Sequence, residues 1–163
     1  MSMDNYVQIM LESLKRKEEL LDRIISKNEA QSKCVAGKEY EDIDWDAFDL
    51  LVTEKEILID RINTMDEGFQ SLYDRVREQL LDNRDKYSDS IKQMQEVIRH
   101  LTDKGIAIQT GEERNRAAID KVLMGRKKVI RKTRNSLKVA DSYHQAMTMN
   151  YGQEAPTVVN NKK

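Results

Sequence analysis

The sequence predicts an all-α fold, an elongated antiparallel helical bundle or coiled coil of three long helices. The composition supports this, because the 163 residues include one proline (Pro156) and six glycines, with 35% charged and 39% hydrophobic residues. Apolar residues also recur at spacings of three and four along most of the chain. We expect one domain, residues 1–151, followed by a disordered tail, residues 152–163.

The first helix is expected over about residues 3–36. Gly37 follows its last apolar residue, in the position where glycine commonly ends a helix. Six acidic residues then lie between positions 39 and 49, and Asp42 or Asp44 should cap the next helix, since acidic groups favour the positive end of the helix dipole. The apolar stripe of the first helix comprises Val7, Met10, Leu11, Leu14, Leu21, Ile24, Ile25 and Val35.

The second helix is expected over about residues 44–81. Its seam, the line of residues that faces the other helices, passes through Gly68 without a change of register, so we expect at most a bend there. The seam spacing fails after Leu81, which places a connection between Leu81 and Ser88. The seam comprises Phe48, Leu51, Lys55, Leu58, Ile62, Met65, Phe69, Leu72, Val76 and Gln79.

The third helix is expected over about residues 87–149, roughly 90 Å if continuous. A break between Gly105 and Gly111 would instead produce a fourth helix. Glu112 and Asn115 are polar seam residues, of the kind that fixes register and partner number. The seam comprises Tyr87, Ile91, Met94, Ile98, Leu101, Gly105, Ile108, Glu112, Asn115, Ile119, Val122, Arg126, Val129, Thr133, Ser136, Ala140, Tyr143 and Met147.

No residues have the spacing of a catalytic, metal or cofactor site. His100 and His144 are far apart, no glycine-rich loop follows a strand, and the acidic segment lacks the offsets of a calcium-binding loop. The single cysteine, Cys34, is expected as a small apolar residue near a helix end. Because no catalytic or cofactor spacing is present, we expect a non-catalytic protein with no cofactor. No apolar run approaches the roughly 20 residues of a membrane span, so we also expect a cytoplasmic protein with no membrane insertion.

A basic stretch lies between residues 121 and 140, where no acidic residue interrupts the cations. Such a stripe can contact phosphates, but this one lacks interleaved aromatic residues and a base-reading motif. We expect a solvated face, or a face that meets the acidic segment before the second helix, and no nucleic-acid partner. The basic residues are Lys121, Arg126, Lys127, Lys128, Arg131, Lys132, Arg134 and Lys138.

The last third of the third helix has a wider apolar face than one seam needs. Leu123, Ile130 and Leu137 repeat every seven residues beside the seam. Two interpretations are open: ordinary packing in a three-helix core, and a groove for the amphipathic helix of a partner. Several methionines nearby would suit an adaptable surface: Met124, Met147 and Met149.

Three features together resemble a known family. A long first helix, an acidic link and a second helix with Glu54-Lys55-Glu56 before Ile57-Leu58 precede a very long last helix. The middle of that last helix carries Ile108, Glu112 and Asn115, with Ile119 beyond, and its basic end runs into Ala140-Asp141-Ser142-Tyr143 before a short polar tail. Over about residues 6–151, this layout resembles the flagellar type III export chaperones of the FlgN-like class.

The resemblance implies a cytoplasmic chaperone that binds the C-terminal helices of flagellar hook-associated proteins, the hook–filament junction proteins. It would prevent their premature assembly and deliver them to the export gate. The alternative is a structural coiled-coil or scaffold protein that self-associates, and a homodimer stays open in either case. Carried over by position, the partner-binding surface would comprise Ile119, Val122, Leu123, Val129, Ile130, Leu137 and Tyr143.

Overall fold

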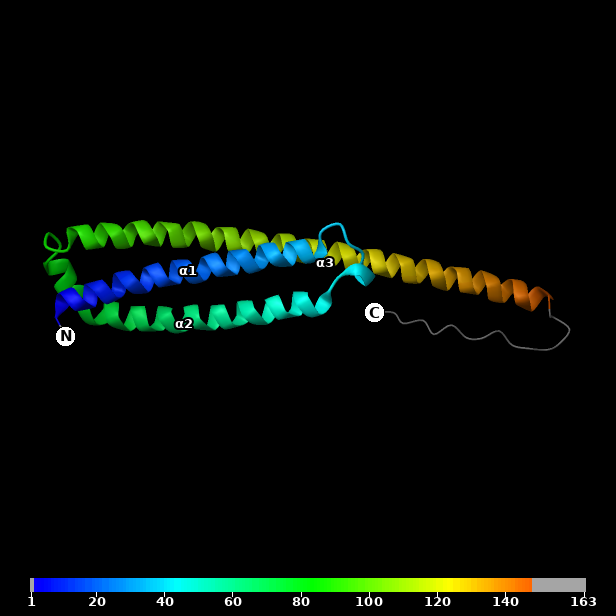
Figure 1. The fold of residues 1–163 in the computed structure, drawn as a ribbon, viewed down its shortest axis with the longest axis horizontal. Helices are drawn as coiled ribbons and strands as arrows, with labels where there is room; N and C mark the ends of the chain where they lie inside the picture. The colour runs from blue at the N-terminus through cyan, green and yellow to red at the C-terminus, as the bar shows by residue number, and fades with distance from the viewer. Residues whose placement is uncertain (1, 148–163) are drawn as a thin grey trace.

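The computed structural model describes residues 2–147, which form three long α-helices and one short 3-10 helix (Figure 1). The expected tail, residues 152–163, and the last two residues of the expected third helix lie outside the described residues. Where the structure describes the chain, the expected helix bounds are right to within one residue, and this part contains no strand. The elements are α1 (Met3–Val35), η1 (Tyr40–Asp42), α2 (Trp45–Asp82) and α3 (Ser88–Met147).

Local capping explains where the helices begin and end. The side chain of Ser2 accepts a hydrogen bond from the backbone N–H of Asn5 at 3.3 Å, at the start of α1. Gly37 has a φ of 66° just after α1, a left-handed conformation that glycine adopts without steric cost. Asp44 accepts from the backbone N–H of Ala47 at 3.0 Å, so it is the N-cap of α2, whereas Asp42 ends η1.

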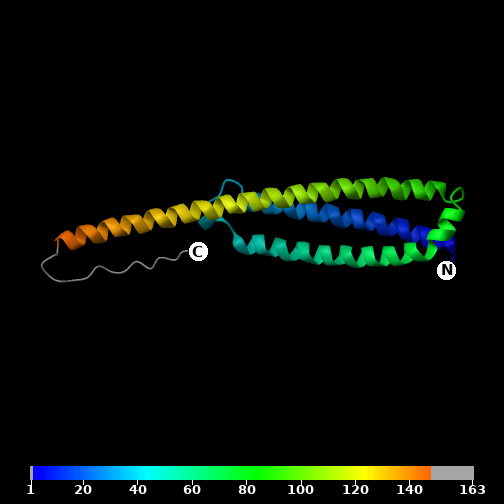
Figure 2. The same ribbon diagram turned by 180° about the vertical axis from the view of Figure 1, so that it is seen from behind.

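Each helix runs antiparallel to the one before it in the chain (Figures 1 and 2). In both views α1 lies between α2 and α3. Close backbone contacts join α1 to α2 and α1 to α3. The core is therefore a line of three clusters along α1. The buried members of these clusters are Val7, Met10, Leu11, Leu14, Val76, Leu80, Tyr87, Met94 and Val97, then Leu20, Leu21, Ile24, Leu58 and Ile62, then Val35, Ile43 and Phe48.

The expected seam is shifted by one residue at two places. Near the end of α2, Leu80 is buried and Gln79 is exposed, because a straight helix drifts by about 20° per heptad and the drift accumulates over four heptads. On α3, Val97 is buried against the first cluster, whereas Ile98 lines the apolar groove between α2 and α3. Cys34 packs against the third cluster, as expected of a small apolar residue near the end of α1.

The glycines do not interrupt the helices. α2 passes through Gly68, and α3 passes through Gly105 and Gly111 as one helix of 60 residues, so the four-helix alternative is wrong. Gly111 has a packing role, because a Cβ atom there would lie 3.2 Å from the side-chain nitrogen of Asn28. Glycine at this position allows α1 and α3 to approach closely.

Replacing Gly68 should stabilise the protein. Nothing lies within 4 Å of a Cβ atom built at this exposed position, so Gly68→Ala should raise the free energy of unfolding by about 1 kcal/mol. Urea unfolding followed by circular dichroism measures the change. Gly111→Ala is the matched control, because its contact with Asn28 should remove part of the same gain. Equal gains in the two variants would contradict the close approach at Gly111.

The turn between α2 and α3 is tied to the start of α1. The hydroxyl of Tyr87 donates a hydrogen bond to the carboxylate of Asp4 at 2.6 Å. This hydrogen bond raises the pKa of Tyr87, and burial and the negative charge of Asp4 raise it further, while Lys86 opposes them. The bond joins residues that are 83 positions apart and closes this end of the bundle.

This raised pKa predicts a loss of stability in alkali. Because the pKa of Tyr87 is higher in the folded state than in the unfolded state, its contribution is complete below about pH 10 and is lost as the pH rises through the folded value. The wild type should therefore be more stable than Tyr87→Phe at neutral pH, and the gap should narrow above about pH 10. Urea unfolding of both proteins across this range measures it; a gap that does not change with pH would contradict the assignment.

Candidate partner-binding site

The last part of α3 extends beyond the bundle. α1 ends at Val35 and α2 begins at Trp45, whereas α3 continues to Met147 (Figures 1 and 2). We call residues 123–147 the α3 extension; at 1.5 Å per residue it is roughly 37 Å long. Neither α1 nor α2 runs beside it, so the apolar residues along most of this segment stay exposed.

The structure divides the expected partner-binding residues into two groups. Ile119 and Val122 are half-buried and pack against the third core cluster. The other members are exposed on the α3 extension: Leu123, Val129 (59% exposed), Ile130 (45%), Leu137 (56%) and Tyr143 (68%). The interpretation of Leu123, Ile130 and Leu137 as ordinary core residues of this three-helix bundle is therefore wrong. A binding role for the exposed residues stays a prediction.

These exposed residues continue the face of α3 that packs in the bundle. Val129 follows Val122 by seven residues, and Ile130 follows Leu123 by the same spacing, so each pair lies on one side of the helix. Val122 touches the third cluster, and the apolar line runs on from it into solvent. We call this line the apolar stripe; it comprises Leu123, Val129, Ile130, Leu137 and Tyr143. The stripe continues a core-facing surface, and among the described residues no helix packs against it.

The basic stretch meets the acidic segment at one residue. The guanidinium of Arg126 lies 3.8 Å from the ring centroid of Tyr40, and its Nε atom lies 3.9 Å from the carboxylate of Glu41. This contact holds η1 against α3. The basic residues that follow Arg126 lie on the α3 extension, beyond the acidic segment, so the expected meeting of the two charged regions is right only at its edge.

A cleft opens where the α3 extension leaves the bundle. Its volume is about 490 Å³, and it lies between residues 35–41 and one side of α3. Its α3 wall includes Val122, Gly125 and Val129, so it is continuous with the apolar stripe. A helix lying along the α3 extension would reach this cleft with one of its ends.

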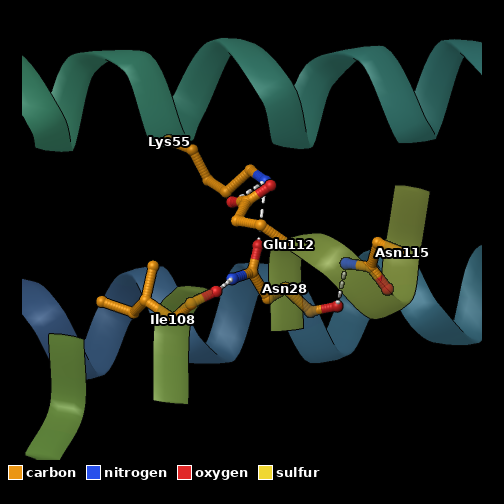
Figure 3. Close-up of polar contacts among 5 residues, drawn as sticks. All are labelled: Asn28, Lys55, Ile108, Glu112 and Asn115. Carbon is orange, nitrogen blue, oxygen red and sulfur yellow. Dashed lines mark hydrogen bonds and ion pairs between the residues drawn. The ribbon is translucent and has the colours of Figure 1, made fainter. Parts of the chain in front are cut away.

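A buried polar layer joins the three helices inside the bundle, before the α3 extension begins (Figure 3). The ammonium group of Lys55 donates to the side-chain oxygen of Asn28 at 2.9 Å and pairs with the carboxylate of Glu112 at 2.6 Å. Asn115 donates to the backbone carbonyl of Asn28 at 3.0 Å, and Asn28 donates to the carbonyl of Ile108 at 3.5 Å. One residue from α2 is thus connected to α1 and α3 at a single level.

The sequence placed most of this layer and missed one member. Lys55, Glu112 and Asn115 stand in the expected seams of α2 and α3, whereas Asn28 was not assigned to the seam of α1. Its signal was present, because Ile24, Asn28, Gln31 and Val35 continue the three-and-four spacing and all four are buried. A polar residue at an apolar position of the pattern was the sign of this layer.

Metal-ligand groups, membrane-spanning helices and unpaired buried polar atoms are absent from the described residues. Within residues 2–147, no three His, Cys, Asp or Glu side chains are grouped closely enough to hold a metal ion. Over the same residues, none of the helices combines the length and the apolar character that crossing a bilayer requires. Every deeply buried side-chain nitrogen or oxygen in this part has a hydrogen-bond partner.

The fold and the exposed surface define a three-helix bundle protein with one projecting amphipathic helix. The chain matches no protein-family model, no curated protein and no solved structure. The resemblance to the flagellar export chaperones therefore rests on the residues and their order alone.

Proposed function

We propose that this protein is a cytoplasmic, non-catalytic export chaperone that binds helical C-terminal segments of flagellar hook–filament junction proteins through the α3 extension. The observation that carries the proposal is the apolar stripe, which continues the core-facing side of α3 and is covered by no helix of residues 2–147. An apolar helix face of this kind is a binding site for the amphipathic helix of a partner.

The physical task of such a chaperone fits this geometry. Subunits that polymerise through coiled-coil termini must have those termini covered before export. The α3 extension offers a seam of roughly 37 Å, enough to cover a helix of about 25 residues. The bundle holds this seam in a helical conformation before the partner arrives, which lowers the ordering cost of binding.

Binding of purified components tests the proposal. The full chain is mixed with a full-length hook–filament junction protein, or with the same protein lacking its C-terminal helices, and complexes are measured by size-exclusion chromatography with light scattering. A complex that forms only with the full-length cargo supports the proposal. Failure to bind any junction protein, together with a stable oligomer of the chain alone, would favour a self-associating scaffold instead.

A further inference from the structure

We propose that the partner helix on the α3 extension carries acidic residues along both edges of its apolar face. This inference rests on the helix-binding function proposed above and adds the charge of the partner. It is carried by two observations: the apolar stripe continues an interface already present in the bundle, and cations line both of its edges.

Continuity with the bundle core favours a helix as the occupant. On the side of α3 that carries Ile119 and Val122, the third cluster of the bundle covers the apolar residues. About two turns beyond Val122, Val129 and Ile130 on the same side are exposed. A partner helix would take the place that α1 and α2 leave empty where α1 ends and α2 begins.

The same geometry disfavours a flat partner. The end of α1 and η1 stand on the side of α3 that carries the stripe, and a packed helix rises about 10 Å above its neighbour. A bilayer surface or a nucleic-acid duplex would meet this step before it reached the base of the stripe. A single helix can lie in line with α1 and avoid it.

Cations stand on both edges of the stripe. Lys127 and Lys138 are eleven residues apart, about three turns, so they share one edge, next to Leu123 and Ile130. Lys121 and Lys132 have the same spacing and share the other edge, next to Val129. These four lysines are exposed. A partner with acidic residues beside its apolar face would place carboxylates opposite both rows.

The charge of this segment is unbalanced within the chain itself. Residues 1–120 carry 18 basic and 27 acidic residues, a formal charge of −9, whereas residues 121–147 carry eight basic and one acidic, a formal charge of +7. Like charges near one another on a helix destabilise it. A second α3 extension would add more positive charge, and residues 148–163 carry only Glu154 against Lys162 and Lys163. Neither supplies the acidic edges.

Synthetic helices test the inference directly. Three labelled peptides of about 28 residues share leucines at heptad positions a and d, and carry Glu, Gln or Lys at the flanking e and g positions. Binding to the full chain is measured by fluorescence anisotropy at peptide concentrations too low for self-association. We expect the Glu peptide to bind about tenfold more tightly than the Gln peptide, the Lys peptide not to bind, and the preference to disappear near 1 M NaCl.

Matched variants locate the effect on the protein. Lys127→Glu with Lys138→Glu should weaken binding of the Glu peptide about tenfold. Lys92→Glu with Arg99→Glu makes the same change in net charge at exposed positions of the same helix, inside the bundle, and should leave binding within about twofold. Loss of binding in both variants would mean that net charge alone attracts the peptide, which would overturn the placement.

Further probes separate the other occupants. A Glu peptide with serine at positions a and d, single-stranded DNA and anionic phosphatidylserine vesicles should each bind far more weakly than the Glu peptide. Equal binding by any of them overturns a helix as the preferred partner. Equal binding of the Glu and Gln peptides overturns the acidic edges but leaves the proposed function intact. If the Glu peptide binds but no junction protein does, this inference stands and the proposed cargo is contradicted.

Discussion

Ile130→Glu should abolish partner binding without affecting the fold. Ile130 lies in the middle of the apolar stripe and is 45% exposed, so a charge there costs the unbound protein little, within about 0.5 kcal/mol. Under a partner helix the same carboxylate would be buried without a partner, which should weaken binding of a junction-protein C-terminal segment about a hundredfold, or roughly 2.7 kcal/mol. Isothermal titration calorimetry measures the binding, and thermal melting followed by circular dichroism checks the fold.

Met124→Glu is the matched control for this prediction. Met124 is also on the α3 extension and is 60% exposed, but it precedes Ile130 by six residues, a rotation of about 120° around the helix, and lies opposite the centre of the stripe. The change in charge and in polarity is the same. Binding should stay within about threefold of the wild type. If both variants lost binding equally, a face-specific surface on α3 would be wrong.

The fold could be predicted because its determinants are periodic and local. Apolar residues at three-and-four spacing determine each seam. Gly37 marks the end of α1, and Asp44 marks the start of α2. The short helix η1 was not predicted, since three residues contain no period to detect. The shift from Gln79 to Leu80 could not be seen either, because a strict heptad repeat does not include the drift of a straight helix.

The candidate site was only partly predictable, because periodicity does not show which seam residues have a neighbour. Val122 and Val129 occupy equivalent seam positions, one heptad apart, yet Val122 packs against the third cluster and Val129 is exposed. The distinction comes from where α1 and α2 stop beside α3. The expected helix lengths already indicated that the third helix would outrun the others, and this difference was the available signal.

The polar layer at Lys55 provides the second large effect, this time on stability. Lys55 is buried, with 7% of its surface exposed, and its ammonium group donates a hydrogen bond to Asn28 and pairs with Glu112. Lys55→Ala removes the packed alkyl chain and leaves the side-chain oxygen of Asn28 without its donor. We expect the free energy of unfolding to fall by about 2–4 kcal/mol. Glu112 is half-exposed, so water replaces much of what its carboxylate loses, and its share of this cost is small.

Two comparison variants divide this cost into its parts. Lys55→Met keeps most of the alkyl packing and removes the charge, so it should cost about half as much as Lys55→Ala. Lys15→Ala, at an exposed position of α1, should change stability by less than about 0.5 kcal/mol. Urea unfolding gives all three values. If Lys55→Ala were as mild as Lys15→Ala, the layer would contribute nothing to stability. If Lys55→Ala lowered the free energy of unfolding and Lys55→Met did not, the loss would come from packing of the alkyl chain alone. The predicted intermediate value for Lys55→Met means that α2 is held to α1 and α3 partly by this one charge.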